Sequence, residues 1–178
     1  MATEMPNSSA ADTRLRQRAR PRTTKRKRTY DVPGHSHLLT FSCYRRRPYL
    51  ATDGAKDAFL ESLAASRKRL GYEIVAFVVM PEHVHLLVFP KAPGLKVASI
   101  LQSVKQPVAR RLKGDGPFWQ PGGGHDRNIH STKAANAAIE YVHNNPVVRG
   151  LSRSQHGYKW SSASWYRDRT GPLELDPW

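Results

Sequence analysis

The chain has 178 residues, and its 29 lysines and arginines outweigh 14 acidic residues to give a formal net charge of +15 at pH 7. A single cysteine, Cys43, excludes an intrachain disulfide and fits a reducing cytoplasm. No segment approaches the roughly 18 apolar residues of a membrane-spanning helix, and the N-terminus lacks the apolar core of a signal peptide. We therefore expect a cytoplasmic, nucleoid-associated protein with no membrane contact.

The positive charge indicates a polyanionic partner, because each cation that neutralises a phosphate releases condensed counterions. Much of it lies in residues 1–33, where basic residues recur from Arg14 to Arg28 with almost nothing apolar between them. Such a segment buries too little surface to offset its ordering entropy, so we expect a disordered arm. The arm either binds DNA without sequence preference or is simply solvated. Residues 34–151 are expected to form the main domain, with an aromatic and serine-rich tail over 152–178 packed on it.

The first half of the main domain predicts one helix among three strands. The strands are expected over 36–43, 72–79 and 83–89. Thr52 or Asp53 can cap the helix at its start, and Gly71 ends it. A tight turn at Pro81-Glu82 joins the last two strands as a hairpin.

The second half predicts two helices around a short edge strand over 126–129. Apolar residues recur at helical spacing over 95–112, but Pro107 should break or kink this helix, for instance by starting a second one. Ser131 or Thr132 caps the last long helix, which should run through Asn145 and stop at Pro146.

This order of elements, with a hairpin at its centre, predicts an α+β fold. The economical arrangement is a ferredoxin-like sandwich, an antiparallel sheet with helices on one face. The last long helix is an addition to that plan.

Two histidines, His83 and His85, lie two residues apart in the third predicted strand and therefore share one face of it. Two adjacent imidazoles can hold one divalent ion, although such a pair can also be ordinary surface or core histidines. The amide oxygen of Asn145 can supply a third ligand and leave positions open for water and a phosphate oxygen. These ligands suit Mg²⁺ or Mn²⁺, and Zn²⁺ is also compatible.

Tyr141 is the candidate nucleophile, and it shares a helical face with Asn145 four residues later. A phenol is mostly protonated at neutral pH and needs a nearby cation or base to attack phosphorus. Attack would form a covalent phosphotyrosine and conserve the bond energy for a second transfer. The alternative is a tyrosine that packs in the core. His143, two positions further on, points away from Tyr141 and is expected to pack or to contact the tail.

Four separated segments resemble the HUH single-tyrosine transposases, and in particular the branch called REP-associated tyrosine transposases. The segment MPEHVHLLV over 80–88 resembles the metal-binding motif, and YVHNNPVVRGL over 141–151 resembles the helix of the catalytic tyrosine. The segments FWQ over 118–120 and YKWSSA over 158–163 match the same branch. The resemblance spans about residues 35 to 166.

The resemblance implies metal-dependent cleavage and joining of single-stranded DNA at hairpins formed by imperfect palindromes. In this family the tyrosine attacks a scissile phosphate and leaves a 5′-phosphotyrosine and a free 3′-hydroxyl. Carried over, Tyr141 becomes the nucleophile, while His83, His85 and Asn145 become ligands for Mg²⁺ or Mn²⁺. Glu82 departs from the asparagine frequent before the histidine pair. We expect a turn residue there, facing away from His83 if the strand extends that far, rather than a contact to metal or water.

Further residues are candidates for DNA contact. They are Lys105, Arg110, Arg111, Arg127, Trp119 and His37. The charged ones can bind phosphates or be merely solvated, Trp119 can stack on unpaired bases or close over the core, and His37 can line the site or serve as a structural hydrogen bonder. The enzyme can act as a monomer or a homodimer. Two other functions remain open, namely a domesticated nucleic-acid-binding protein without catalysis and a metal-dependent nuclease that uses water.

Overall fold

The computed structural model describes residues 31–112, 114–122 and 124–176, so the predicted basic arm over 1–33 lies almost wholly outside the described residues. Four strands form one antiparallel sheet in the order β2-β3-β1-β4. The strands are β1 (Ser36–Ser42), β2 (Tyr72–Val79), β3 (His83–Pro90) and β4 (His125–Ile129). With two helical connections, this strand order is that of a ferredoxin-like sandwich, as predicted.

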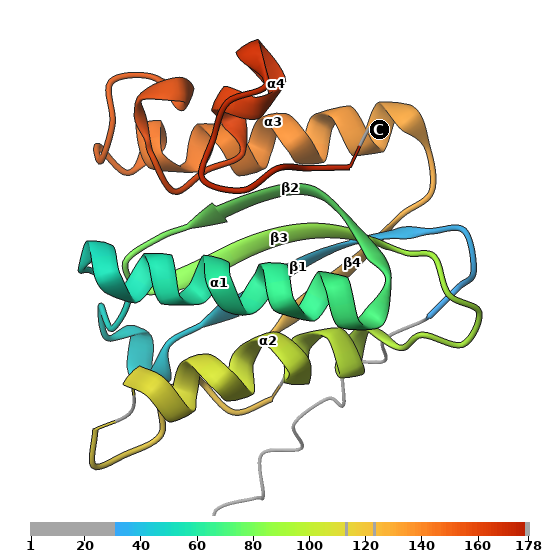
Figure 1. Cartoon of the computed structure of the whole chain (residues 1–178). Helices are drawn as coiled ribbons and strands as arrows, with labels where there is room; N and C mark the ends of the chain where they lie inside the picture. Colours follow the sequence, from blue (N-terminus) through green and yellow to red (C-terminus); the bar gives the residue numbers. More distant parts are fainter. Residues whose placement is uncertain (1–30, 113, 123, 177–178) are drawn as a thin grey trace, which may run out of the picture.

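Helices cover both faces of the sheet (Figure 1). Helices α1 (Asp53–Leu70) and α2 (Val97–Leu112) lie together on one face, as the ferredoxin-like plan predicts. The added helix α3 (Thr132–Val148) lies on the opposite face with the short helix α4 (Ala163–Asp168). Two short 3₁₀ turns complete the described elements, η1 (Tyr44–Arg46) and η2 (Gln155–Gly157). Over the described residues, no helix combines the length and the apolar character needed to cross a membrane.

The helix ends follow local side-chain chemistry. Thr52 caps α1 by accepting a hydrogen bond from the backbone N–H of Ala55, and Ser131 caps α3 by accepting one from Ala134. Gly71 ends α1 in the left-handed conformation, with φ of +70°, which glycine adopts without a steric cost. Gly71 was predicted in this position, and Thr52 and Ser131 were each one of two predicted caps.

Pro107 does not break its helix or start a second one, so that part of the prediction was wrong: α2 is continuous from Val97 to Leu112. A proline inside a helix costs one backbone hydrogen bond and some crowding, about 3 kcal/mol. Val104 and Val108 on either side of it are fully buried, and the hydroxyl of Ser62 in α1 donates to the carbonyl of Val104 at 2.8 Å. Packing between the two helices therefore outweighs the local cost of the proline.

Pro146 does not stop its helix either, because α3 continues to Val148. The pyrrolidine ring of Pro146 is buried, and its carbonyl accepts from the backbone N–H of Leu151 at 2.8 Å. The backbone N–H of Arg149 bonds to the carbonyl of Asn145 at 3.0 Å. Asn145 consequently lies within regular helix, one turn after Tyr141.

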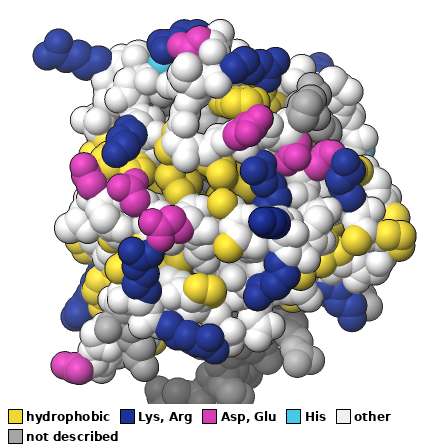
Figure 2. Space-filling model, viewed as in Figure 1, with side chains coloured by type: hydrophobic (Ala, Val, Ile, Leu, Met, Phe, Trp, Pro, Cys, Tyr) yellow, Lys and Arg dark blue, Asp and Glu magenta, His cyan; other side chains and the backbone are white. Residues whose placement is uncertain are grey.

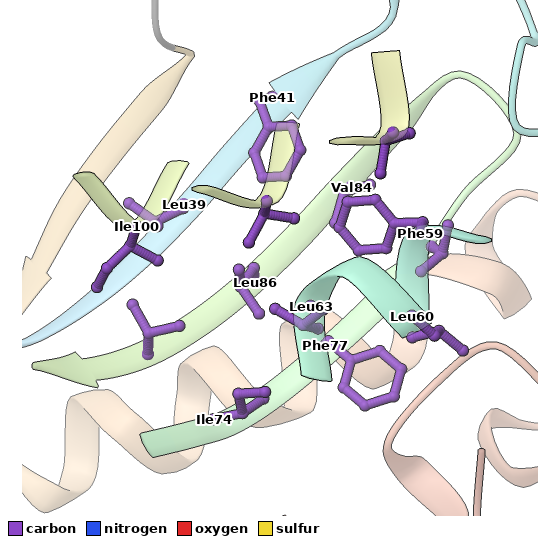
Figure 3. Packing of buried hydrophobic residues seen from close by; sticks show 14 of the residues in the cluster. Leu39, Phe41, Phe59, Leu60, Leu63, Ile74, Phe77, Val84, Leu86 and Ile100 are labelled. Carbon is purple, nitrogen blue, oxygen red and sulfur yellow. The ribbon is translucent and has the colours of Figure 1, made fainter. Parts of the chain in front are cut away.

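The larger hydrophobic core lies between the sheet and helices α1 and α2. Figure 3 shows Phe41 and Leu86 from the sheet facing Phe59, Leu63 and Ile100 from these helices. Strand β3 contributes Val84, Leu86 and Val88, which are all fully buried. Because side chains alternate along a strand, the residues between them face α3.

The C-terminal segment packs along the outer edge of β2, where the sheet would otherwise end. Val79 donates its backbone N–H to the carbonyl of Trp160 at 2.9 Å, and Ser162 donates to the carbonyl of Phe77 at 3.0 Å. Ser161 forms an isolated antiparallel bridge with Val78. These bonds satisfy backbone groups that an uncovered edge strand would expose.

Candidate active site

The histidine pair lies at the start of β3, an inner strand of the sheet, on the face toward α3. His83 and His85 are buried, with 5 % and 3 % of their surface exposed. Their Nε2 atoms face each other at 3.0 Å, and the ring planes are nearly perpendicular. The spacing of two residues therefore brings both imidazoles to one point, as the strand pattern predicts.

Each imidazole is held through its other ring nitrogen. Nδ1 of His83 lies 3.1 Å from Oε1 of Glu82, and Nδ1 of His85 lies 2.8 Å from the hydroxyl of Thr40 on β1. An ionised carboxylate only accepts hydrogen bonds, so His83 donates from Nδ1 and carries a lone pair on Nε2. The Thr40 hydroxyl can accept in the same way from His85. In that arrangement both Nε2 lone pairs converge.

Burial keeps the pair uncharged. It lowers the pKa of His83, against the opposing effect of the neighbouring Glu82 carboxylate. Burial, with a further contribution from His83, lowers the pKa of His85 to about 4. Both rings are therefore neutral at physiological pH, which is the form in which imidazole binds metals.

Helix α3 places Tyr141 and Asn145 against this pair. The ring of Tyr141 meets that of His85 edge to face, with centroids 5.1 Å apart, and 51 % of the tyrosine is exposed. The side-chain amide of Asn145 donates to the carbonyl of Tyr141 at 2.7 Å, and a hydrogen bond between Asn145 and His85 favours the protonated imidazole. The structure thus assembles all four residues singled out for chemistry.

The donor set fits a divalent cation. Two neutral imidazole nitrogens converge, and an amide side chain adjoins them. The other nitrogen of each ring is hydrogen-bonded, and such bonds orient histidine ligands in metal sites. Among the described residues, no group of three or more His, Cys, Asp or Glu side chains is placed to hold a metal ion. A three-ligand site here therefore depends on Asn145.

Glu82 has a larger part in the site than the sequence suggested. It lies in the turn before β3, as predicted, but its carboxylate bonds to His83 instead of facing away, because the extended strand begins only at His83. Its carboxylate also pairs with Arg149 at 2.8 Å and lies 3.7 Å from Arg46. Burial alone would raise the pKa of Glu82. The combined effect of His83 and Arg149 in the opposite direction is larger, so the net pKa is below the usual value.

Arginines beside the site were not singled out from the sequence. Arg45, Arg46 and Arg47 are exposed in and after the turn η1, and the preceding Cys43 donates its backbone N–H to the carbonyl of Glu82 at 2.9 Å. Arg45 and Arg46 both have φ near +50°, a region that few residues other than glycine adopt. The run of three arginines after β1 was the available signal.

Three of the predicted DNA contacts lie on the side of the sheet covered by α1 and α2, where Trp119 and His37 are buried and Lys105 of α2 is half-buried. Trp119 is 9 % exposed, its ring packs against Phe41 and Phe118, and its indole N–H donates to the carbonyl of Lys105 at 2.8 Å. Burial lowers the pKa of Lys105, whose ammonium lies over the Trp119 ring. His37 is 1 % exposed and bonded to Asp126 at 3.0 Å. None of the three adjoins the histidine pair.

The remaining predicted DNA contacts are exposed arginines away from the histidine pair. Arg110 and Arg111 belong to α2, on the face of the sheet away from Tyr141, and Arg111 pairs with Glu61 of α1. Arg127 lies on the edge strand β4. On the face seen in Figure 2, lysine and arginine side chains are dispersed among acidic and hydrophobic ones.

His143 contacts the tail, in agreement with the prediction for it. The imidazole is buried, its Nε2 lies 2.8 Å from the hydroxyl of Ser162, and its ring meets that of Tyr166. Tyr141 and His143 thus face opposite ways from the same turn of helix.

The family model described as "Transposase IS200 like" matches residues 32–145, which include the histidine pair, Tyr141 and Asn145. No curated protein matches the chain. The structure of a REP-associated tyrosine transposase bound to a REP hairpin superposes with a TM-score of 0.71 at 21% identity, covering 85% of this chain and 91% of that one. A proposed transposase from Deinococcus radiodurans R1 matches with a TM-score of 0.46 at 24% identity, covering 66% of this chain and 96% of its own.

Proposed function

The chain belongs to the IS200-like transposases, of the HUH single-tyrosine type, and from that premise we propose that it cleaves and rejoins single-stranded hairpin DNA through Tyr141. The observation that carries the proposal is the placement of Tyr141. A half-exposed phenol lies against the buried His83–His85 pair, with Asn145 one helical turn away. A tyrosine with only a packing role would not need this surrounding set.

The exposed phenol is the group that reacts with DNA. Its oxygen attacks the scissile phosphorus, the new phosphotyrosine bond forms to the 5′ side, and the bond to the 3′ oxygen breaks. The phenol proton leaves to solvent, and the departing 3′ oxygen takes up a proton to become a hydroxyl. A second 3′-hydroxyl can then attack the phosphotyrosine in the reverse sense, so the strand is joined without an external energy source.

His83, His85 and Asn145 are the residues that would hold Mg²⁺ or Mn²⁺. A bound ion would polarise the phosphate and stabilise charge on the leaving oxygen. Glu82 and Thr40 keep the two imidazoles in place for this purpose. Since all these residues and Tyr141 belong to one chain, the geometry supports a site that is complete in a monomer, while a homodimer remains compatible with it.

Hairpin DNA is the proposed substrate, because the superposed REP-associated transposase is bound to a REP hairpin. The exposed Arg45 and Arg47, in and directly after the turn η1 whose Arg46 lies 3.7 Å from Glu82, are candidates to bind the strand's phosphates. The net charge of +15 supports the same partner.

The proposal is tested with labelled single strands that fold into the imperfect palindromes flanking the gene. We expect a covalent protein–DNA band on a denaturing gel with Mg²⁺ or Mn²⁺, and its loss with EDTA and in Tyr141→Phe. Cleavage with full turnover by Tyr141→Phe would instead assign a nuclease that uses water. Tight binding with neither cleavage nor adduct would assign a non-catalytic DNA-binding protein.

A further inference from the structure

Glu82 is buried and charged, and it contacts both halves of the proposed site. Only 8 % of the residue is exposed. Its Oε1 lies 3.1 Å from Nδ1 of His83 and 2.8 Å from Nη1 of Arg149. A buried carboxylate is costly unless its partners satisfy it, so these contacts account for its position.

The contact with His83 decides which ring nitrogen faces the site. Because the carboxylate accepts the proton of Nδ1, the lone pair of that imidazole is on Nε2, the atom that lies 3.0 Å from His85. A neutral imidazole left without this partner can place its proton on Nε2 instead, and such a tautomer cannot bind a cation there.

The contact with Arg149 reaches the helix that carries the nucleophile. Arg149 follows α3 directly, and its backbone N–H bonds to the carbonyl of Asn145 at 3.0 Å. The ion pair with Glu82 therefore ties the last turn of α3 to the start of β3. A single carboxylate thus contacts both His83 and the residue that follows the turn of helix bearing Asn145.

We propose that Glu82 is a positioning residue of the metal site, which orients His83 directly and holds the end of the tyrosine helix through Arg149. This inference rests on the proposed function and extends it to a residue in the turn before the histidine pair. It explains why a glutamate is compatible with a position where related motifs often carry asparagine, since either side chain offers an acceptor oxygen to Nδ1.

The first test measures Mn²⁺ affinity from the electron paramagnetic resonance signal of the free ion, without DNA. We expect Glu82→Ala to weaken Mn²⁺ binding about 10- to 100-fold, the usual loss when a partner of a histidine ligand is removed. Glu82→Gln keeps an acceptor oxygen and should stay within about threefold of the parent. The matched control is Glu61→Ala, which breaks the surface pair with Arg111 on α1 and should leave the affinity unchanged.

The second test follows the contact with Arg149. At saturating Mn²⁺, Arg149→Gln should slow formation of the Tyr141–DNA adduct about tenfold in the parent, and much less in a Glu82→Gln chain, because the carboxylate charge that pairs with Arg149 is already absent there. Equal slowing in both backgrounds would overturn the connection through Arg149.

The outcomes separate this inference from the proposal beneath it. Mn²⁺ binding by Glu82→Ala as tight as in the parent, with only a lower melting temperature, would reduce Glu82 to a structural role and overturn the inference alone. A loss in Glu82→Gln as large as in Glu82→Ala would also overturn it, because the acceptor oxygen would then be irrelevant. If His83→Ala binds Mn²⁺ as tightly as the parent, the proposed metal site is overturned as well.

Discussion

The two faces of strand β3 are both buried, but one is wholly apolar and the other carries the histidine pair beside Leu87. Toward α1 and α2, the side chains of Val84, Leu86 and Val88 are fully buried in an apolar cluster. Toward α3, His83 and His85 are buried equally well, but among hydrogen-bond partners. One strand thus supplies both the packing of the fold and the chemistry of its site.

A small domain can keep polar groups buried when apolar burial elsewhere offsets their cost. Desolvation disfavours the protonated form of an imidazole in this position, as the pKa of about 4 for His85 indicates. The apolar face offsets that cost, because the burial of each aliphatic side chain contributes about 1.5–3 kcal/mol. We therefore expect changes at the site residues on the α3 face to alter chemistry more than stability, and changes at Val84, Leu86 and Val88 on the other face to do the reverse.

The largest expected effect is on chemistry. Tyr141→Phe should lower adduct formation more than about a thousandfold, as the loss of a covalent nucleophile does in other enzymes, while the melting temperature stays the same because the side chain is half exposed. The matched control is Tyr166→Phe, which removes the hydroxyl of another exposed tyrosine whose partner is the carbonyl of Val75. That variant should form the adduct normally, and equal losses in both would contradict the assignment of Tyr141 as the nucleophile.

The opposite effect is expected from Leu86→Ala. Removal of this fully buried side chain should lower the free energy of unfolding by about 2–5 kcal/mol, through lost burial and the cavity left behind. At a temperature where the variant is folded, its adduct formation should remain within about threefold of the parent. Urea unfolding followed by circular dichroism measures the first quantity. A large loss of adduct formation in the fully folded variant would show that the two faces are not separable.

A smaller effect is expected where the tail meets α3. The hydroxyl of Ser162 accepts from the backbone N–H of Phe77 at 2.9 Å and lies 2.8 Å from Nε2 of His143. Ser162→Ala leaves these buried groups without that partner and should cost about 1–3 kcal/mol in the free energy of unfolding. Hydrogen exchange should show the loss concentrated in β2 and the tail. Unchanged exchange there would mean that the tail is held by its apolar contacts alone.

The smallest expected effect is on alkaline stability. Burial raises the pKa of Tyr158 to about 12, and its hydroxyl donates to the carbonyl of Val79. Because the folded chain disfavours the ionised phenol, the contribution of Tyr158 to the free energy of unfolding is fully present below pH 10. It is lost as pH rises toward 12. Tyr158→Phe should unfold with a shallower dependence on pH over that range. Identical pH profiles for parent and variant would contradict the assignment.

The alternation of β3 was readable from the sequence because side-chain direction in a strand is strictly local. The caps at Thr52, Gly71 and Ser131 were readable for the same reason. From these local signals the sheet, the helices and the convergence of His83 with His85 could be predicted.

Features that depend on tertiary contacts could not be read in the same way. Pro107 and Pro146 carry strong local stop signals, and packing around them overrides both. For Trp119 the sequence allowed either stacking on bases or closure over the core, and only the tertiary contacts decide for the core. Glu82 lies in a turn, where strand alternation no longer specifies direction, so its bond to His83 appears only in three dimensions.

The central claim is that Tyr141 becomes covalently linked to DNA, and mass mapping of the adduct tests it most directly. The chain is incubated with hairpin DNA and Mn²⁺, digested with protease and nuclease, and its peptides are sequenced by mass spectrometry. The account predicts a nucleotide 5′-phosphate attached to Tyr141 and to none of the other tyrosines. Attachment at a different residue, or DNA cleavage in full without a modified peptide, would contradict it.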